Sequence, residues 1–243
     1  MIKEFVTNTG LMVPAVTKEQ MFEVDCIAVE KTGPNLFQMM ENAGRNLALT
    51  VIDLMKEKSL GKKALIFAGA GGNGGGGICA ARHLLNHSYE PIVILSNEKK
   101  MREIPAYQLR IFRKSGGQII PIEKVKGVNP DIIVDAIIGY SLISAPRGDV
   151  LEMINFINRN NIPKISLDIP TGVLATTGEN PGEFVKPDKT ITLALPKTGL
   201  YPEKCGEIIL TDIGIPKFVY EKIGLKYNSP FLDKYIIPIS VKE

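Results

Sequence analysis

The stretch that decides the fold reads Ala64-Leu65-Ile66-Phe67-Ala68-Gly69-Ala70-Gly71-Gly72-Asn73-Gly74-Gly75-Gly76-Gly77. Its first five residues are apolar without a break, which is typical of a short strand buried on both faces of a sheet. Seven of the nine residues from 69 to 77 are glycine, so the backbone there can adopt positive φ angles and approach a ligand closely. A helix is predicted from about residue 77 to residue 87. A glycine loop between a buried strand and a helix N-terminus favours a phosphate or nucleotide site over a merely flexible loop.

The alternation of strand and helix continues along the chain. Further apolar runs predict strands at residues 92–95, 132–134, 165–167 and 190–193, and helical stretches lie at about 103–115 and 148–160. Strands that alternate with helices imply right-handed crossovers and a mostly parallel sheet with helices on both faces. No linker, repeat or charge run marks a boundary, so we predict one α/β domain over residues 1–243.

Two helices are predicted before the first of these strands. Residues Thr17-Lys18-Glu19-Gln20 match a capping box, in which two side chains bond the backbone N–H groups at a helix start. Apolar residues then recur at helical spacing until Gly33-Pro34, which predicts the end of this helix. A second, longer helix is predicted from an apolar stripe made of Leu36, Met39, Met40, Ala43, Leu47, Val51 and Leu54.

The composition is that of an ordinary globular protein and excludes several classes. The net charge is only +3, and basic residues are interleaved with acidic ones, so we expect no nucleic-acid partner. No run approaches the roughly 20 apolar residues of a membrane helix, and the N-terminus lacks the apolar run of a secretory signal. The three cysteines, at 26, 79 and 205, lack metal-type spacing. We read them as reduced thiols and expect a cytoplasmic location.

Polar residues follow the predicted strands at their carboxyl ends, where ligands bind in open parallel sheets. Asp135 and Asp168 each follow a buried strand, which favours a partner or a catalytic role over a simple turn cap. The oxygens of Asp135, Asn73 and Thr171 are hard ligands, suited to an alkali or similar cation rather than to zinc or copper. Lys197 follows the last strand, and we expect it to contact phosphate or to lie at the rim of the site.

The glycine loop also matches the pattern G-x-G-x-x-G at Gly69, Gly71 and Gly74. Glu98 ends the next strand, close to the position of the acid that binds ribose in dinucleotide dehydrogenases. An NAD-dependent dehydrogenase is therefore one alternative. The Walker lysine motif is absent, which argues against NTP hydrolysis.

Further motifs, in order along the chain, are Val13-Pro14-Ala15-Val16-Thr17, Met39-Met40-Glu41-Asn42-Ala43-Gly44-Arg45, Ala80-Ala81-Arg82-His83-Leu84, Asp135-Ala136-Ile137-Ile138-Gly139, Leu167-Asp168-Ile169-Pro170-Thr171-Gly172, Ala194-Leu195-Pro196-Lys197-Thr198-Gly199-Leu200 and Asp212-Ile213-Gly214-Ile215-Pro216. Together with the glycine loop they resemble the YjeF N-terminal domain family, the NAD(P)H-hydrate epimerases. The resemblance covers about residues 13–216, the core of the predicted domain. So many ordered segments are more specific than a lone glycine motif.

The resemblance implies a three-layer αβα sandwich with a Rossmann-like sheet, and a homodimer formed near the two N-terminal helices. It implies epimerisation at C6 of hydrated NADH or NADPH (NADHX or NADPHX), which serves a separate dehydratase. Asp168 is the expected catalytic residue. A potassium ion is expected at Asn73, Asp135 and Thr171, the last in place of the usual serine. Substrate contacts are expected at Gly72, Asn73, Gly74, Gly75, Gly76, Gly139, Tyr140, Ser141, Leu142, Ile143, Ser144, Ala145 and Asp168.

The glycine loop departs from the family pattern at two positions. The family usually reads Asn-Asn-Gly-Gly-Asp-Gly, whereas this chain has Gly72 in place of the first Asn and Gly76 in place of the Asp. A second alternative follows, in which the domain has no catalysis and binds nucleotides or protein partners. The presence of Asn73, Asp135 and Asp168 favours the enzyme.

Overall fold

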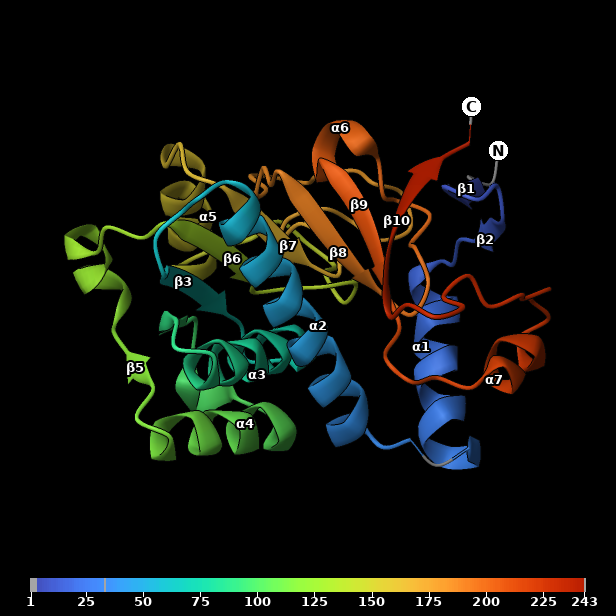
Figure 1. Cartoon of the computed structure of the whole chain (residues 1–243), viewed down its shortest axis with the longest axis horizontal. Coiled ribbons are helices and arrows are strands. Elements are labelled where there is room, and N and C mark those ends of the chain that lie inside the picture. The colour runs from blue at the N-terminus through green and yellow to red at the C-terminus, as the bar shows by residue number, and fades with distance from the viewer. Residues whose placement is uncertain (1–3, 33, 243) are drawn as a thin grey trace.

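The buried apolar runs pair side by side in one ten-stranded sheet (Figure 1). The computed structural model describes residues 4–32 and 34–242. Seven strands run parallel, in the order β5-β4-β3-β6-β7-β8-β9. Their bounds are β3 Lys63–Ala68, β4 Glu90–Leu95, β5 Gln118–Ile119, β6 Ile132–Ala136, β7 Lys164–Leu167, β8 Lys189–Leu193 and β9 Glu207–Thr211. The predicted mostly parallel sheet is confirmed.

Three antiparallel strands extend the sheet beyond β9. Strand β10 (Ile236–Val241) pairs with β9, β1 (Glu4–Thr7) pairs with β10, and β2 (Met12–Pro14) pairs with β1. The first and last strands therefore lie side by side at one end of the molecule (Figure 1). None of these strands is predicted from the sequence, because β1 and β2 are short and because Pro238 interrupts the signal of β10.

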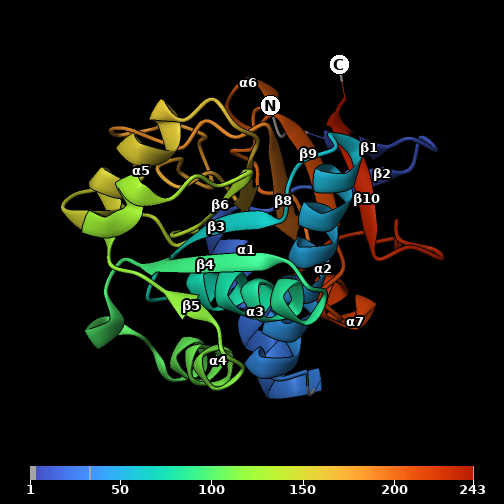
Figure 2. The same ribbon diagram turned by 60° about the vertical axis from the view of Figure 1, so that its left-hand side comes forward.

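Helices cover both faces of the parallel strands (Figure 2). Apolar side chains of α2, α3 and α4 share one buried cluster with the sheet, including Leu47, Ile78 and Phe112. Met153 and Ile157 of α5 pack against the opposite face. This arrangement confirms the predicted αβα layers. The helix bounds are α2 Leu36–Glu57, α3 Gly72–Asn86, α4 Glu103–Lys114 and α5 Asp149–Arg159.

The predicted capping box starts helix α1 (Lys18–Ile27). The Thr17 hydroxyl accepts from the Gln20 N–H at 3.3 Å, and the Gln20 side chain accepts from the Thr17 N–H at 2.9 Å. A π-helical turn (Ala28–Thr32) follows α1. Gly33, part of the predicted helix stop, lies outside the described residues. The remaining helical segments are η2 Glu98–Lys100, η3 Ile122–Gly127, α6 Pro202–Cys205 and α7 Lys217–Lys222. Within the described ranges, no helix has the length and apolar character to cross a membrane.

The predicted start of the helix near residue 77 is wrong, because α3 begins at Gly72. None of the glycines from 69 to 77 has a positive φ, and close packing explains them instead. A Cβ on Gly74 would overlap the carbonyl oxygen of Gly69, and a Cβ on Gly77 would lie 2.5 Å from the Cβ of Ala136. Glycine costs about 1 kcal/mol relative to alanine in a helix, and burial of α3 between α2 and the sheet offsets this.

A polar cluster fixes α3 against α2. The Glu41 carboxylate of α2 accepts from Arg82 at 2.5 Å and lies 2.8 Å from Nε2 of His83. Burial acts to raise the pKa of Glu41, but hydrogen bonds from Arg82, Cys79 and His83 outweigh it and lower the pKa to about 2. On the same helix, Gly44 lets Cys79 approach closely. These contacts set the direction in which the N-terminus of α3 points.

Candidate functional site

The carboxyl ends of the parallel strands surround a cavity of about 1020 Å³. The segments that follow β3, β4, β6 and β7 line it, and residues of α1 and α2 close one side. Strand β4 lies on one side of β3, and β6 lies on the other. The strand order therefore reverses at β3, which makes this a topological switch point of the sheet. Open α/β sheets bind their ligands at such a point.

Asp168 lines this cavity directly after β7, and only 3% of its surface is exposed. Lys197 forms an ion pair with its Oδ1, and the backbone N–H of Tyr140 donates to its Oδ2 at 2.9 Å. Both carboxylate oxygens are therefore held in place. Asp168 also has a φ of +69°, a strained backbone conformation that clusters at functional sites.

Lys197 is fully buried behind Asp168, with 1% of its surface exposed. Besides the ion pair, its Nζ donates to the carbonyl of Leu193 at 2.9 Å and lies 3.5 Å from the hydroxyl of Thr192. The expectation that Lys197 contacts phosphate or lies at the rim is wrong. A buried ammonium needs a counter-charge, and Asp168 supplies it.

Tyr140 connects Asp168 to a second cavity-lining carboxylate, Asp25 of α1. The Tyr140 hydroxyl donates to Oδ2 of Asp25 at 2.5 Å. Burial raises the pKa of Asp25, and the hydrogen bond from Tyr140 opposes this only in part. Burial also raises the pKa of the Tyr140 hydroxyl, and the charge of Asp25 adds to the effect. One tyrosine therefore positions two carboxylates. Asp25 carries little signal in the sequence beyond its place next to the buried Val24 of α1.

The N-terminus of α3 points its polar groups at the same cavity. Its N-cap, Gly71, has no side chain to bond the first N–H groups. Asn73 lines the cavity, and within the described chain its buried Nδ2 has no hydrogen-bond partner. Gly139 lies between this amide and Asp168, since a Cβ there would lie 3.1 Å from Oδ1 of Asn73 and 2.7 Å from Oδ2 of Asp168. Unpaired N–H groups at the positive end of a helix dipole suit a phosphate.

Asp135 and Thr171 lie beneath the cavity rather than in its lining. Asp135 is fully buried within β6, and burial raises its pKa. The Thr171 hydroxyl donates to Oδ1 of Asp135 at 2.6 Å, and Ser166 and the Thr171 N–H donate to Oδ2 at 2.8 and 2.9 Å. No cationic side chain of the described ranges neutralises this carboxylate. A buried carboxylate beside a hydroxyl supplies hard oxygen ligands of the kind that fit an alkali cation.

Most of the predicted substrate contacts do line the cavity. They are Gly72, Asn73, Gly76, Gly139, Tyr140, Ser141, Leu142, Ile143, Ser144, Ala145 and Asp168. Gly74 and Gly75 do not, because the Gly69 carbonyl covers one and the Met40 side chain covers the other. In the segment after β4 the sequence pointed only to Glu98, whereas Ser96, Asn97, Lys100 and Arg102 line the cavity.

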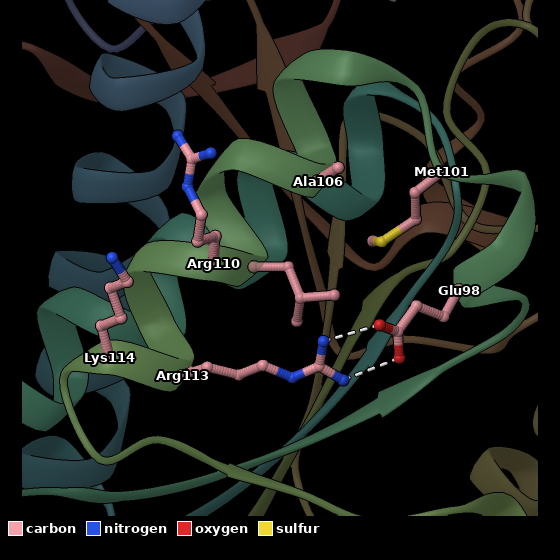
Figure 3. A pocket seen from close by; sticks show the side chains of 7 residues that line it. Glu98, Met101, Ala106, Arg110, Arg113 and Lys114 are labelled. Atoms are coloured by element: carbon pink, nitrogen blue, oxygen red, sulfur yellow. Dashed lines mark hydrogen bonds and ion pairs between the residues drawn. The ribbon is translucent and has the colours of Figure 1, made fainter.

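Glu98 lies in that segment but outside the cavity. Arg113 of α4 donates to its two oxygens at 2.6 and 2.7 Å (Figure 3). The pair borders a separate pocket of about 370 Å³, together with Met101 and Leu109. The dehydrogenase hypothesis assigned Glu98 to the ribose of a dinucleotide. The structure does not support that role, because Glu98 lies outside the cavity and its carboxylate is paired with Arg113.

Comparisons with known proteins point to one family. The family model described as YjeF-related protein N-terminus matches residues 36–199. An NAD(P)H-hydrate epimerase from Dehalogenimonas lykanthroporepellens is 45% identical, and the match covers 100% of both chains. The bifunctional NAD(P)H-hydrate repair enzyme Nnr of Hyperthermus butylicus is 33% identical over 83% of this chain, which spans only 38% of that relative. The enhancer of mRNA-decapping protein 3 of Macaca fascicularis is 31% identical over 98% of this chain and 47% of its own.

A solved structure supports the fold independently. The crystal structure of yeast ynu0 superposes with a TM-score of 0.79 over 93% of this chain and 100% of its own. The two sequences are 24% identical. At this level of identity the likeness is one of architecture, and it agrees with the parallel sheet and its flanking helices.

Proposed function

The chain belongs to the family described as YjeF-related protein N-terminus, and on this basis we propose that it is an isomerase that epimerises NADHX and NADPHX at C6. The reaction interconverts the R and S forms of these damaged cofactors. A separate dehydratase then restores the S form to NADH or NADPH. The relatives named as bifunctional repair enzymes support the link to such a partner, since this chain spans only part of their length.

The observation that carries the proposal is the position of Asp168 at the cavity wall. Its carboxylate faces the cavity of about 1020 Å³, and Lys197 and the Tyr140 N–H fix its orientation. Asn73 and the N-terminus of α3 lie beside it and suit the diphosphate of the same ligand. The reacting ring and the phosphates of one molecule can therefore be bound together.

The chemistry suits a positioned carboxylate. The C6 centre carries a hydroxyl beside the ring nitrogen, so it is a carbinolamine. When the C6–oxygen bond breaks, water leaves and an iminium-like species remains; water that adds to the other face inverts the centre. The Lys197 ammonium passes a proton through Asp168 to the leaving hydroxyl, and Asp168 returns a proton from the incoming water to Lys197. The negative charge of Asp168 also stabilises the cationic species.

Metal dependence is general in this epimerase family, and we propose potassium with Asn73, Asp135 and Thr171 as its ligands. The buried carboxylate of Asp135, which has no cationic partner in the described ranges, supports this choice. The ion would supply a fixed positive charge that neutralises Asp135 and holds the adjoining backbone. The residues of the chain itself carry the proton and orient the substrate.

A domain without catalysis is the second candidate. Gly72 and Gly76 favour it, because they remove an amide and a carboxylate that the family usually carries. The similarity to the decapping protein also favours it. In this form the cavity would bind a nucleotide without converting it.

One coupled assay separates the two candidates. Purified protein and potassium are added to the R form of NADHX with an S-specific dehydratase in excess, and the recovery of NADH is followed. An epimerase accelerates the recovery well above the spontaneous rate. A rate equal to the spontaneous one would reject the epimerase and leave the binding domain.

The Asp168→Asn variant tests the catalytic residue. We expect turnover to fall by roughly 100-fold to 10,000-fold, the usual contribution of a proton-transfer group. Binding of NADP⁺, measured by calorimetry, should stay detectable because Asn keeps the size of Asp and the other groups that line the cavity are unchanged. An unchanged turnover would remove Asp168 from the mechanism.

Three further properties complete the proposal. We propose that the whole chain is one domain, which the continuous sheet supports. We propose a homodimer through α1 and its neighbour α7, supported by the exposed Phe22 and Phe218 on these helices, 62% and 48% accessible. We also propose a cytoplasmic location, because the described cysteines form no disulfide.

A further inference from the structure

The distances between the strand ends indicate where each part of the proposed substrate would lie. Asp168 follows β7, the N-terminus of α3 follows β3, and the segment from 96 to 102 follows β4. Strand β4 lies three positions from β7 in the sheet, which is about 14 Å at the usual strand spacing. A dinucleotide with its damaged ring at Asp168 and its diphosphate at α3 therefore places its adenosine over the end of β4.

The cavity presents two positive side chains at this end. Lys100 and Arg102 both line it, and neither forms an ion pair with another described residue. Glu103 is the acidic neighbour in the same part of the lining. Glu98 does not line this cavity, and Arg113 binds both of its oxygens (Figure 3).

Sheets of this kind distinguish two dinucleotides at this position. An acid binds the free 2′-hydroxyl of the adenosine ribose in NAD, whereas an arginine nearby accommodates the 2′-phosphate in NADP. In this chain Glu98 lies outside the cavity and pairs with Arg113, whereas two cations without an ion-pair partner among the described residues line the cavity. We propose that Lys100 and Arg102 form a subsite for the 2′-phosphate, so that the chain prefers NADPHX over NADHX. The inference rests on the proposed function for the identity of the substrate.

The matched test compares two double variants that change the net charge equally. Lys100→Ser/Arg102→Ser removes the subsite, while Lys99→Ser/Lys114→Ser removes two exposed cations outside the cavity. The measured quantity is the ratio of kcat/KM for NADPHX to that for NADHX. We expect the subsite variant to lower this ratio by roughly tenfold for each cation, the scale of one charge-assisted hydrogen bond. The control variant should leave the ratio unchanged.

A binding measurement keeps this inference separate from the proposed function. Adenosine 2′,5′-bisphosphate and adenosine 5′-monophosphate are titrated into each protein by calorimetry at low salt. The wild-type chain should bind the bisphosphate more tightly, and the subsite variant should lose that preference. Salt should weaken the preference as well, because exposed charges are screened.

The outcomes separate the two proposals. If neither hydrate is epimerised but the preference for the bisphosphate depends on Lys100 and Arg102, the function fails and the subsite stands. If both hydrates are epimerised and the subsite variant leaves the ratio unchanged, the function stands and the subsite is overturned. Equal binding of both probes by the wild-type chain also overturns it.

Discussion

At the residue scale, Asp168 and Lys197 form a buried pair in which each charge depends on the other. Lys197→Met removes the cation, keeps a similar volume and leaves Asp168 buried without a counter-charge. We expect the free energy of unfolding to fall by about 3–5 kcal/mol, measured by urea denaturation at pH 7. Asp168→Asn in the Lys197→Met background should recover part of this loss. Strictly additive effects of the two changes would show that the pair is not coupled.

Tyr140 and Asp25 give a pH-dependent prediction at the same scale. Burial raises the pKa of Asp25, so its contribution to stability is complete below the unfolded value of about 3.9 and is lost as the pH rises through the folded value. The Tyr140 hydroxyl limits that loss because it donates to the charged form. Tyr140→Phe should therefore raise the pKa of Asp25 further. We expect a loss of about 1–3 kcal/mol at pH 7 and a smaller loss near pH 4.

Urea midpoints between pH 4 and 8 check this expectation. Tyr107→Phe is the control, because Tyr107 is 41% exposed and lies on α4, away from Asp25. Its effect should be small at every pH. An effect of Tyr140→Phe that does not vary with pH would mean that the hydroxyl does not act through Asp25.

At the scale of elements, close packing of α3 explains the glycines at its start. Gly74→Ala would push a Cβ into the Gly69 carbonyl, whereas a Cβ on Gly72 meets nothing within 4 Å. We expect Gly74→Ala to lower the free energy of unfolding by about 1–3 kcal/mol and to weaken NADP⁺ binding. Gly72→Ala should change stability by less than about 0.5 kcal/mol. Equal effects in urea denaturation would contradict packing as the reason for Gly74.

The elements differ in how far the sequence predicts them. The strands at 64–68 and 132–134 are predicted from their apolar runs, and α1 from its capping box, because these signals are local. The start of α3 is not, since glycine has a low helix propensity and only contact with Gly69 and Ala136 favours a helix there. The short strand β1 exists through pairing with β10, which follows it by more than 200 residues, and β2 in turn pairs with β1.

At the scale of the whole molecule, the proposed dimer makes a prediction for α1. Phe22 of α1 is 62% exposed, and α1 lies beside α7 (Figure 1). Phe22→Glu places a charge in the proposed interface, and burial of an unpaired charge is costly. Sedimentation equilibrium should show a dimer for the wild-type chain and a monomer for this variant. Tyr107→Glu on α4 should stay dimeric, and a wild-type monomer would reject the interface.

The sequence by itself determined the family, the parallel sheet and most of the residues around the site. Strand patterns and short motifs are local, and parallel strands bring their carboxyl ends to one edge whatever the details of packing. Asp168, Asn73 and most of the predicted contact residues therefore line the cavity as expected.

Only the tertiary structure decided which charges face the substrate. It buries Lys197 behind Asp168, adds Asp25 from a distant helix, and removes Glu98 from the cavity through Arg113. These pairings join residues 15 to 115 positions apart. The free energy of each charge depends on its partner and its burial, and neither is encoded in the spacing of a motif.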